Sequence, residues 1–232
     1  MQIYFEYFTK TPLWFANMQK KQYLCMQILI IPPMLFEANI KDLLNLLPSR
    51  RIHRSKQQMR ELLIQKRRML SADERKALSE SILAQLEQMQ CFRDARTVLL
   101  YYPKNNEVDV LPLFKRHKDK TLLLPVSHRK EMTANPFEGN GKMHRGKFGI
   151  PEPTTEPYIG DIDLIIVPAV AYDKQGHRLG RGGGYYDRFI KKQPHATLIG
   201  VGYDFQLVEE VPTLRHDQKV HRIILPSQTI QV

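Results

Sequence analysis

Residues 163–203 read DLIIVPAVAYDKQGHRLGRGGGYYDRFIKKQPHATLIGVGY and carry the strongest structural signal in the chain. Two apolar, β-branched runs, 163–167 and 197–203, predict buried strands. Between them, residues 185–192 predict a helix that begins directly after a cluster of glycines. A strand, a helix and a second strand in this order favour a parallel pair of strands with the helix packed on the sheet.

The same alternation continues toward the N-terminus. Residues 97–102 (TVLLYY) and 121–126 (TLLLPV) predict two more strands, and residues 110–117 predict a helix between them. We therefore expect an α/β protein of three layers, α/β/α, with a mostly parallel sheet. Ligands of such sheets bind at the carboxyl ends of the strands.

Two helices and one irregular segment complete the predicted domain. A basic helical pattern covers residues 56–70, and Ser71 with Glu74 forms a capping-box pattern that opens a second helix. Residues 127–161 are rich in Gly, Pro, Asn, Lys and Glu. This composition predicts a long irregular insertion of the kind that builds binding surfaces.

Residues 1–54 differ from the rest of the chain. Their aromatic residues follow neither a helical nor an alternating period, and Pro32-Pro33 interrupts the most apolar run, 24–36. That run is shorter than the roughly 20 apolar residues of a transmembrane helix, and no cleavage site of a signal peptide follows it. We expect residues 1–54 to be a poorly ordered extension or a translated stretch upstream of the true start, and residues 55–232 to form the folded domain.

Charge and cysteine content narrow the class of protein. The 232 residues include 35 Lys and Arg against 24 Asp and Glu, which gives a formal net charge of +11. This excess indicates an anionic partner and leaves nucleic acids and phosphorylated metabolites open. Cys25 and Cys91 are too few for a disulfide framework or a zinc cluster, so we expect a reducing, cytoplasmic compartment.

The run RLGRGGGYYD, residues 178–187, combines glycines with two arginines. Glycine lets backbone amides approach a phosphate closely, a helix start adds a positive dipole end, and arginine binds phosphate oxygens in bidentate geometry. The run lacks the Gly-Lys-Ser/Thr triplet of a Walker A loop, and Tyr185 stands where a dinucleotide-binding motif has its third glycine. It predicts an anion cradle, with a flexible turn or an RGG-type RNA segment as alternatives.

This run closely resembles the signature of the 5-formyltetrahydrofolate cyclo-ligase family, whose members are also called methenyltetrahydrofolate synthetases. Family-like segments follow in order at 56–60 (KQQMR), 102–108 (YPKNNEV), 148–153 (FGIPEP) and 217–220 (DQKV), so that the resemblance covers residues 56 to about 225. His221 departs from the family pattern, which often has aspartate there, as does Leu225-Pro226, where threonine-glutamate is commoner.

The resemblance implies an activity, a fold and partners. The implied reaction is the ATP-dependent cyclisation of 5-formyltetrahydrofolate to 5,10-methenyltetrahydrofolate, with release of ADP and phosphate, through a phosphorylated formyl intermediate. The implied fold is similar to ribose-5-phosphate isomerase and CoA-transferase-like proteins, with the catalytic domain in residues 55–232. Reduced folate and ATP would be the small-molecule partners of a cytoplasmic monomer that binds neither nucleic acid nor membrane.

Family likeness also assigns roles to single residues. Arg181 and Tyr185 are expected to be catalytic. ATP is expected to contact Lys56, Arg60, Arg178, Leu179, Gly180, Arg181, Gly182, Gly183, Gly184, Tyr185 and Tyr186. The reduced folate is expected to contact Tyr102, Glu107, Phe148, Arg181, Gly182, Gly183, Gly184 and Tyr185. Magnesium is expected on Asp187 and Asp217, with Asp173 as a reserve ligand.

Plainer interpretations stand beside these roles. Lys56 and Arg60 share a helix face and could form a solvated basic face with residues 66–68 (KRR). Asp187 and Asp217 could be surface carboxylates. Two other functions are also open: a nucleic-acid-binding module, whose affinity would fall steeply with salt, and a small-molecule kinase, which would release a phosphorylated product.

Overall fold

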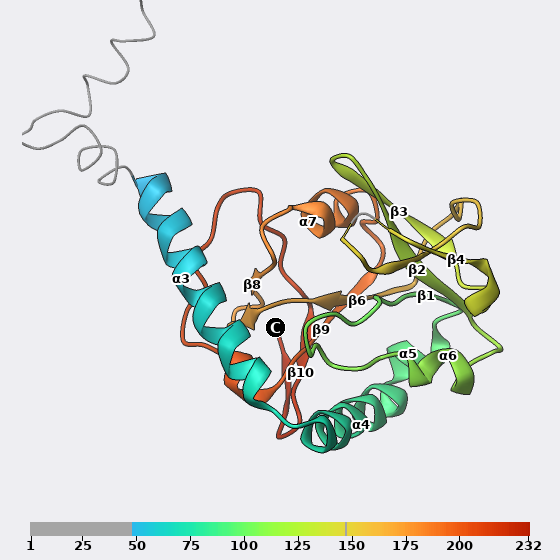
Figure 1. Ribbon diagram of the computed structural model, residues 1–232, viewed down its shortest axis with the longest axis horizontal. Helices are drawn as coiled ribbons and strands as arrows, with labels where there is room; N and C mark the ends of the chain where they lie inside the picture. Colours follow the sequence, from blue (N-terminus) through green and yellow to red (C-terminus); the bar gives the residue numbers. More distant parts are fainter. Residues whose placement is uncertain (1–47, 147) are drawn as a thin grey trace, which may run out of the picture. The chain divides into compact units, whose positions relative to one another are not determined.

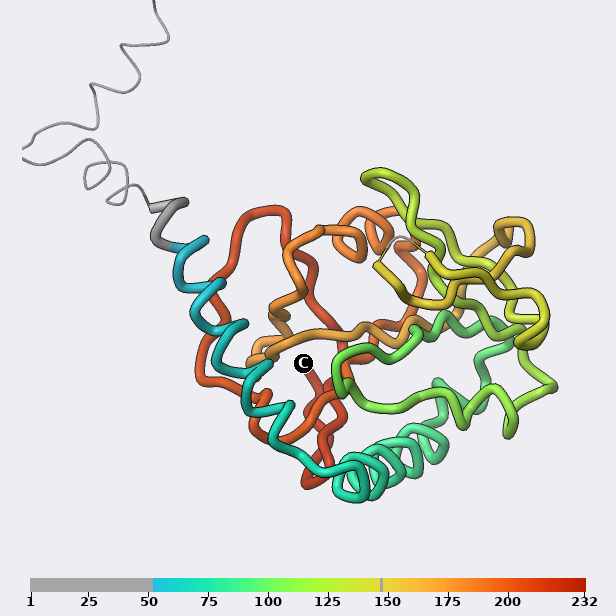
Figure 2. Tube along the Cα trace, in the orientation of Figure 1, coloured from blue at the N-terminus to red at the C-terminus, as the bar shows by residue number. Residues whose placement is uncertain are grey.

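The computed structural model describes residues 48–146 and 148–232 (Figures 1 and 2). Within them a central sheet is flanked by helices. The helices are α3 Pro48–Met69, α4 Ala72–Gln88, α5 Gln90–Asp94, α6 Pro112–Arg116 and α7 Tyr185–Ile190, with short 3-10 turns at η4 Asn140–Lys142 and η5 Asp204–Gln206. The strands are β1 Thr97–Leu99, β2 Thr121–His128, β3 Glu131–Pro136, β4 Met143–Arg145, β5 Pro151–Pro153, β6 Leu164–Pro168, β7 Ala171–Tyr172, β8 Arg178–Leu179, β9 Thr197–Val201, β10 Arg222–Ile224 and β11 Thr229–Gln231.

The central sheet is mostly parallel, as predicted. Within the described residues its strand order is β11-β10-β9-β6-β1-β2-β3. The five inner strands run parallel to one another, from β10 through β9, β6 and β1 to β2. The two edge strands, β3 and β11, pair antiparallel with their neighbours.

Both faces of the sheet are buried, which explains the continuous apolar runs of its strands. In β6, Leu164 and Ile166 belong to one hydrophobic cluster, whereas Ile165 and Val167 belong to a second. The first cluster includes residues of α4, α5 and α6, and the second includes Phe189 of α7. Figure 1 shows these two groups of helices on opposite sides of the sheet. The predicted three-layer arrangement is therefore confirmed.

Helix α4 begins at the capping box that the sequence predicts. The capping box of α4 forms as predicted, because the Ser71 hydroxyl accepts from the Glu74 amide at 3.2 Å and the Ser71 amide donates to the Glu74 carboxylate at 2.7 Å.

Helix α3 begins at Pro48 and so crosses the predicted boundary between residues 54 and 55. The expectation of poor order upstream falls, up to residue 47, outside the described residues. No described helix has the length and apolarity needed to cross a bilayer.

The predicted irregular insertion at 127–161 is wrong in its first part. Strand β2 continues to His128 and turns through Arg129, whose φ is 31°, into β3. Met132 and Ala134 on β3 are buried against the sheet, while polar residues alternate with them. Because of those polar residues and the proline that ends the strand, the segment was predicted as irregular and not as a strand. Farther along, β4 and β5 form a separate antiparallel pair.

Helix α3 packs beside the short β7–β8 pair rather than on the main sheet. Its Leu63 is buried with Val170 and Leu179, and Met59 packs against the same cluster. The Cα trace shows the segment after β6 lying alongside this helix (Figure 2). This contact brings the basic residues of α3 to the glycine-rich run that follows β8.

Candidate active site

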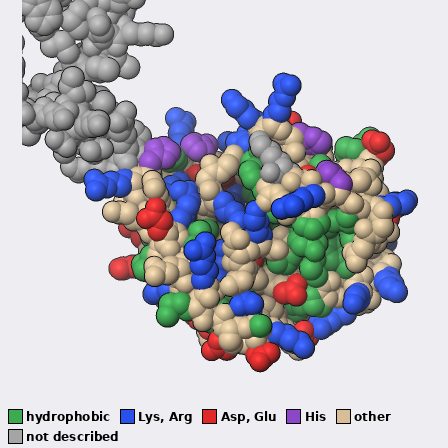
Figure 3. Space-filling view, in the orientation of Figure 1, with side chains coloured by type: hydrophobic (Ala, Val, Ile, Leu, Met, Phe, Trp, Pro, Cys, Tyr) green, Lys and Arg blue, Asp and Glu red, His purple; other side chains and the backbone are tan. Residues whose placement is uncertain are grey.

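A cleft of about 540 Å³ opens where the loops after β1 and β8 meet helix α3. Its lining includes every site residue that the sequence predicts except the reserve metal ligand Asp173: Lys56, Arg60, Tyr102, Glu107, Phe148, Arg178, Leu179, Gly180, Arg181, Gly182, Gly183, Gly184, Tyr185, Tyr186, Asp187 and Asp217. On the face shown in Figure 3, Lys and Arg side chains form a band beside a group of hydrophobic side chains. A second hollow of about 550 Å³ beside α7 shares only Asp217 with the predicted set of described residues. The cleft is therefore the candidate active site.

The glycine-rich loop connects β8 to α7 and depends on its glycines. Gly182 and Gly184 have φ angles of 100° and 65°, which side chains other than glycine rarely adopt. A Cβ at Gly182 would also lie 3.6 Å from the Arg60 guanidinium. Within the described residues, the amides of 181–184 donate to no backbone carbonyl. Because α7 has only six residues, the loop amides rather than the helix dipole would be the donors to a bound anion.

Strand β8 anchors this loop through two buried side chains. The Arg178 side chain is 3% exposed, and its Nη2 donates to Asp187 Oδ1 at 2.7 Å. Leu179 is 1% exposed and packs in the cluster beneath α3. A nucleotide in the cleft could therefore reach Leu179 only through its backbone.

Helix α3 presents Lys56 and Arg60 to the loop, one turn apart. Lys56 is buried and forms an ion pair with Asp217, and Arg60 Nε donates to the Gly180 carbonyl at 2.8 Å. Burial lowers the pKa of Arg60, although the charge of Asp217 acts in the opposite direction. The interpretation of these two residues as a solvated basic face is therefore wrong.

The two aspartates of the cleft both accept several hydrogen bonds. Asp217 accepts from Lys56 and from the Leu214 amide at 2.7 Å, while Asp187 accepts from Arg178 and from the Gln218 amide at 3.0 Å. Burial by itself would raise the pKa of Asp217, but the hydrogen bonds from Lys56 and Leu214 outweigh it, so this pKa lies below its usual value. Asp217 is therefore ionised at neutral pH.

These carboxylates fit a magnesium ion shared with phosphates. Magnesium prefers oxygen ligands and usually takes one or two carboxylates beside substrate phosphates. In the described part of the chain, no cluster of three or more His, Cys, Asp or Glu side chains could hold a metal. The hydrogen bonds of Asp187 end on Oδ1 and those of Asp217 end on Oδ2. The second oxygen of each carboxylate accepts no hydrogen bond from the described residues and could bind the ion.

Glu107 lies at the opposite end of the cleft, in the loop after β1. Asn105 and Asn106 adopt φ angles of 53° and 62°, which turn this loop sharply. The Glu107 side chain is 7% exposed, and its Oε1 accepts from Arg181 Nη2 at 2.6 Å and Nε at 3.1 Å. Its Oε2 accepts from the Lys104 amide at 3.0 Å. Arg181 and Glu107, 74 positions apart in the sequence, thus meet across the cleft.

Aromatic side chains form the wall between these two ends. Phe148 meets Tyr185 edge-on, with ring centroids 5.9 Å apart, and the Tyr185 hydroxyl donates to the Arg129 carbonyl at 2.6 Å. The Tyr186 hydroxyl is buried and has no hydrogen-bond partner among the described residues. Burial raises its pKa, so Tyr186 is a protonated donor rather than a base. Half-buried Tyr102 completes the wall.

Glu152 and Arg67 are among the charged residues near the cleft that went unassigned in the sequence. Glu152 lies in the FGIPEP segment, is 4% exposed, lines the cleft and accepts from the Ser127 amide at 3.2 Å. Arg67 is 2% exposed and lies 3.8 Å from Glu107, so its expected place on a solvated basic face is wrong. Matching to a family segment was the available signal for Glu152. Arg67 is flanked by Lys66 and Arg68, and nothing in the sequence distinguished it from them as a buried residue.

Asp173 and His221 lie outside the cleft, and the position of Asp173 corrects one expectation. Asp173, the reserve metal ligand, is fully buried and accepts from the amides of Gln175, His177 and Val211, so it closes the turn between β7 and β8. His221, which departs from the family pattern, accepts from the Leu198 amide at 3.1 Å. Neither residue is part of the described cleft lining.

Comparisons with known proteins point to one family. A match to the 5-formyltetrahydrofolate cyclo-ligase family covers residues 52–226. A 5-formyltetrahydrofolate cyclo-ligase of Mycolicibacterium smegmatis is 33% identical over 191 residues, which are 76% of this chain and 96% of the relative. The Escherichia coli K12 enzyme of that name is 28% identical over 71% of this chain and 96% of its own length. The solved 5,10-methenyltetrahydrofolate synthetase of Aquifex aeolicus superposes with a TM-score of 0.69 at 35% identity, covering 76% of this chain and 92% of that one.

Proposed function

Because the chain belongs to the 5-formyltetrahydrofolate cyclo-ligase family, we propose that it uses ATP to close 5-formyltetrahydrofolate into 5,10-methenyltetrahydrofolate, releasing ADP and phosphate. The observation that carries this proposal is the single cleft that joins a glycine-rich loop, two cations from α3 and the carboxylate of Glu107. We further propose a cytoplasmic monomer, in keeping with the low cysteine content.

The chemistry needs an activated formyl oxygen. Formamide oxygen is a poor leaving group, so the γ-phosphoryl group of ATP is first transferred to it, which releases ADP and leaves a phosphorylated formyl intermediate. The neighbouring side-arm amine then attacks the formyl carbon and loses its proton. The bond between the formyl carbon and oxygen breaks, and the oxygen leaves as part of the phosphate. Catalysis of such a sequence is mainly alignment and neutralisation of charge.

The phosphate chain of ATP is proposed to lie between α3 and the glycine-rich loop. Lys56 and Arg60 supply positive charge from the helix, and the loop amides of 181–184 supply donors. Arg178 and Tyr186 border the same space. A magnesium ion held by Asp187 and Asp217 would neutralise phosphate charge when bound.

Arg181 is proposed to face the transferring phosphoryl group. Its side chain is 39% exposed and lines the cleft between the loop and Glu107. A guanidinium at this position can follow negative charge as it develops on the phosphoryl oxygens. In doing so, it is proposed to exchange its contact with Glu107 for one with the phosphate.

The reduced folate is proposed to occupy the end of the cleft near Glu107. An ionised carboxylate accepts hydrogen bonds from the N–H groups of the pterin, and Tyr102 and Phe148 offer aromatic surface for its rings. Tyr185, edge-on to Phe148, borders the position of the formyl group. The two substrates would then meet beside Arg181.

The test is the reaction itself. Purified protein with magnesium, ATP and 5-formyltetrahydrofolate is expected to form methenyl product and ADP in equal amounts, and omission of either substrate is expected to stop both. ADP accompanied by a stable phosphorylated small molecule and no methenyl product would establish a kinase instead. If neither product forms and RNA binds with a steep salt dependence, the enzyme assignment fails.

A further inference from the structure

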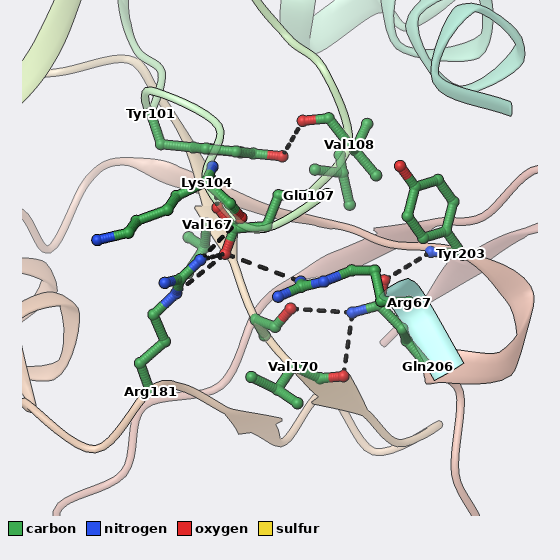
Figure 4. A network of polar contacts seen from close by, with 12 residues as sticks. Arg67, Tyr101, Lys104, Glu107, Val108, Val167, Val170, Arg181, Tyr203 and Gln206 are labelled. Carbon is green, nitrogen blue, oxygen red and sulfur yellow. Dashed lines mark hydrogen bonds and ion pairs between the residues drawn. The ribbon is translucent and has the colours of Figure 1, made fainter. Parts of the chain in front are cut away.

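Arg67 is a buried arginine at the C-terminal end of α3. Its side chain is 2% exposed, whereas Lys66 and Arg68 on either side of it are exposed. Figure 4 shows its guanidinium reaching from the helix toward the carboxylate of Glu107. Arg67 is not among the described residues that line the cleft, so it acts behind the site rather than within it.

The surroundings of Arg67 satisfy its charge only partly. Nη1 lies 3.8 Å from Glu107 Oε1, beyond hydrogen-bond distance, and Nε and Nη2 are buried without a hydrogen-bond partner among the described residues. Burial lowers the pKa of Arg67, although Glu107 raises it. A buried, incompletely paired guanidinium is unfavourable for folding, so a hydrophobic residue would serve the helix better if packing were its only role.

Arg181 approaches the same carboxylate oxygen from the opposite side (Figure 4). It donates two hydrogen bonds to Glu107 Oε1 and one to the Lys104 carbonyl at 2.9 Å. Arg181 is 39% exposed and comes from the glycine-rich loop, whereas Arg67 is held inside the fold by α3. One oxygen of Glu107 therefore has a partly exposed cation from a loop on one side and a buried cation from a helix on the other.

Among the described residues, Arg67 and Arg181 are the ion-pair partners of Glu107. Lys104 donates its amide to Glu107, but its ammonium group donates to the Phe148 carbonyl. Tyr101, Tyr172 and Tyr186 are buried phenols near the carboxylate, and their pKa values are raised by burial and, in smaller measure, by Glu107 itself. These phenols are neutral, so the direct ion pairs of Glu107 come from the two guanidinium groups.

We propose that Arg67 is a positioning residue, the fixed counter-charge that holds the carboxylate of Glu107 in place when Arg181 turns to the phosphoryl group. This inference rests on the proposed function, in which Arg181 leaves Glu107 once ATP is bound. Without Arg67, the departure of Arg181 would leave Glu107 as a buried carboxylate with no ion-pair partner among the described residues. Such a carboxylate is unfavourable, so its side chain would leave the position from which it accepts pterin N–H groups.

The test measures folate affinity with and without nucleotide. Arg67→Met, Arg67→Lys and the matched control Arg68→Met are titrated with 5-formyltetrahydrofolate by calorimetry, alone and with magnesium and a non-hydrolysable ATP analogue. With the analogue bound, Arg67→Met is expected to lose about tenfold or more of its folate affinity, because Glu107 then has no fixed counter-charge. Without nucleotide, Arg181 still pairs with Glu107 and the loss is expected to be small. Arg67→Lys should be intermediate and Arg68→Met should match the parent.

A second measurement covers the case in which Arg67→Met does not fold. The free energy of unfolding is compared for Arg67→Met, Glu107→Gln and the double variant. Removal of the carboxylate charge is expected to restore part of the stability lost by Arg67→Met. If the double variant is no more stable than Arg67→Met, or if Arg67→Met and Arg68→Met bind folate alike with the analogue bound, the proposal is overturned. Neither arm needs turnover, so absence of methenyl product in the parent would reject the proposed function separately.

Discussion

The two ends of the cleft hold their carboxylates in different ways. One end holds both Asp217 and Asp187, and their partner cations, Lys56 and Arg178, themselves line the cleft. Glu107 also has a cleft-lining partner in Arg181, but Arg67 lies behind it, outside the lining. A phosphate chain could thus draw the cations away from both aspartates, whereas Glu107 would keep one.

This difference suits the proposed tasks of the two ends. Cations that line the cleft can turn to incoming phosphates, while the aspartates could hold a metal ion through oxygens that accept no hydrogen bond. A carboxylate that recognises N–H donors must instead stay fixed throughout the reaction. The arrangement of cations would therefore distinguish the proposed metal-binding end from the proposed folate-binding end.

Removal of Arg181 is expected to give the largest effect. Arg181→Ala should lower kcat by about 10²- to 10³-fold, because a donor to the developing phosphoryl charge is lost. Folate affinity in calorimetry should change little, since Arg67 still faces Glu107. Lys174→Ala, an exposed lysine outside the cleft, is the control. A loss of folate affinity as large as the loss of kcat would contradict a fixed counter-charge at Glu107.

Removal of Lys56 should have a smaller effect, which is limited to the KM for ATP. Lys56→Ala is expected to raise the KM for ATP about tenfold, since a charged hydrogen bond to phosphate is lost, and to leave the KM for the folate unchanged. Lys66→Ala, on the exposed side of the same helix, should behave as the parent does. Steady-state kinetics with each substrate varied in turn makes the comparison. An equal rise in both KM values would show that the two ends are not separate.

Loss of the α4 capping box should have the smallest effect and should not change the binding of either substrate. Ser71→Ala is expected to lower the free energy of unfolding by about 1 kcal/mol, because the Glu74 amide loses its acceptor. Both KM values should stay at those of the parent. Denaturant unfolding and kinetics on the same preparation check this. A changed KM would mean that general destabilisation can imitate the effects at either end.

Much of the fold was predictable because its signals are local. Continuous apolar runs such as 163–167 mark strands buried on both faces, and the Ser71 capping box is completed within three residues. Strand β3 escaped prediction because its inward residues, Met132 and Ala134, alternate with polar ones in a segment of loop-like composition. There, pairing with β2 outweighed the local preference.

For the site, the sequence by itself, through family likeness, named candidate residues, and all of them except the reserve ligand Asp173 line one cleft. Only the tertiary structure decided which charges face which. Lys66, Arg67 and Arg68 are alike in the sequence, yet the docking of α3 through Leu63 turns Arg67 alone of the three into the core. Likewise, Glu107 meets Arg181 across 74 positions because the loops after β1 and β8 converge at one edge of the sheet. Burial and ion pairing are set by such long-range packing, which no local pattern encodes.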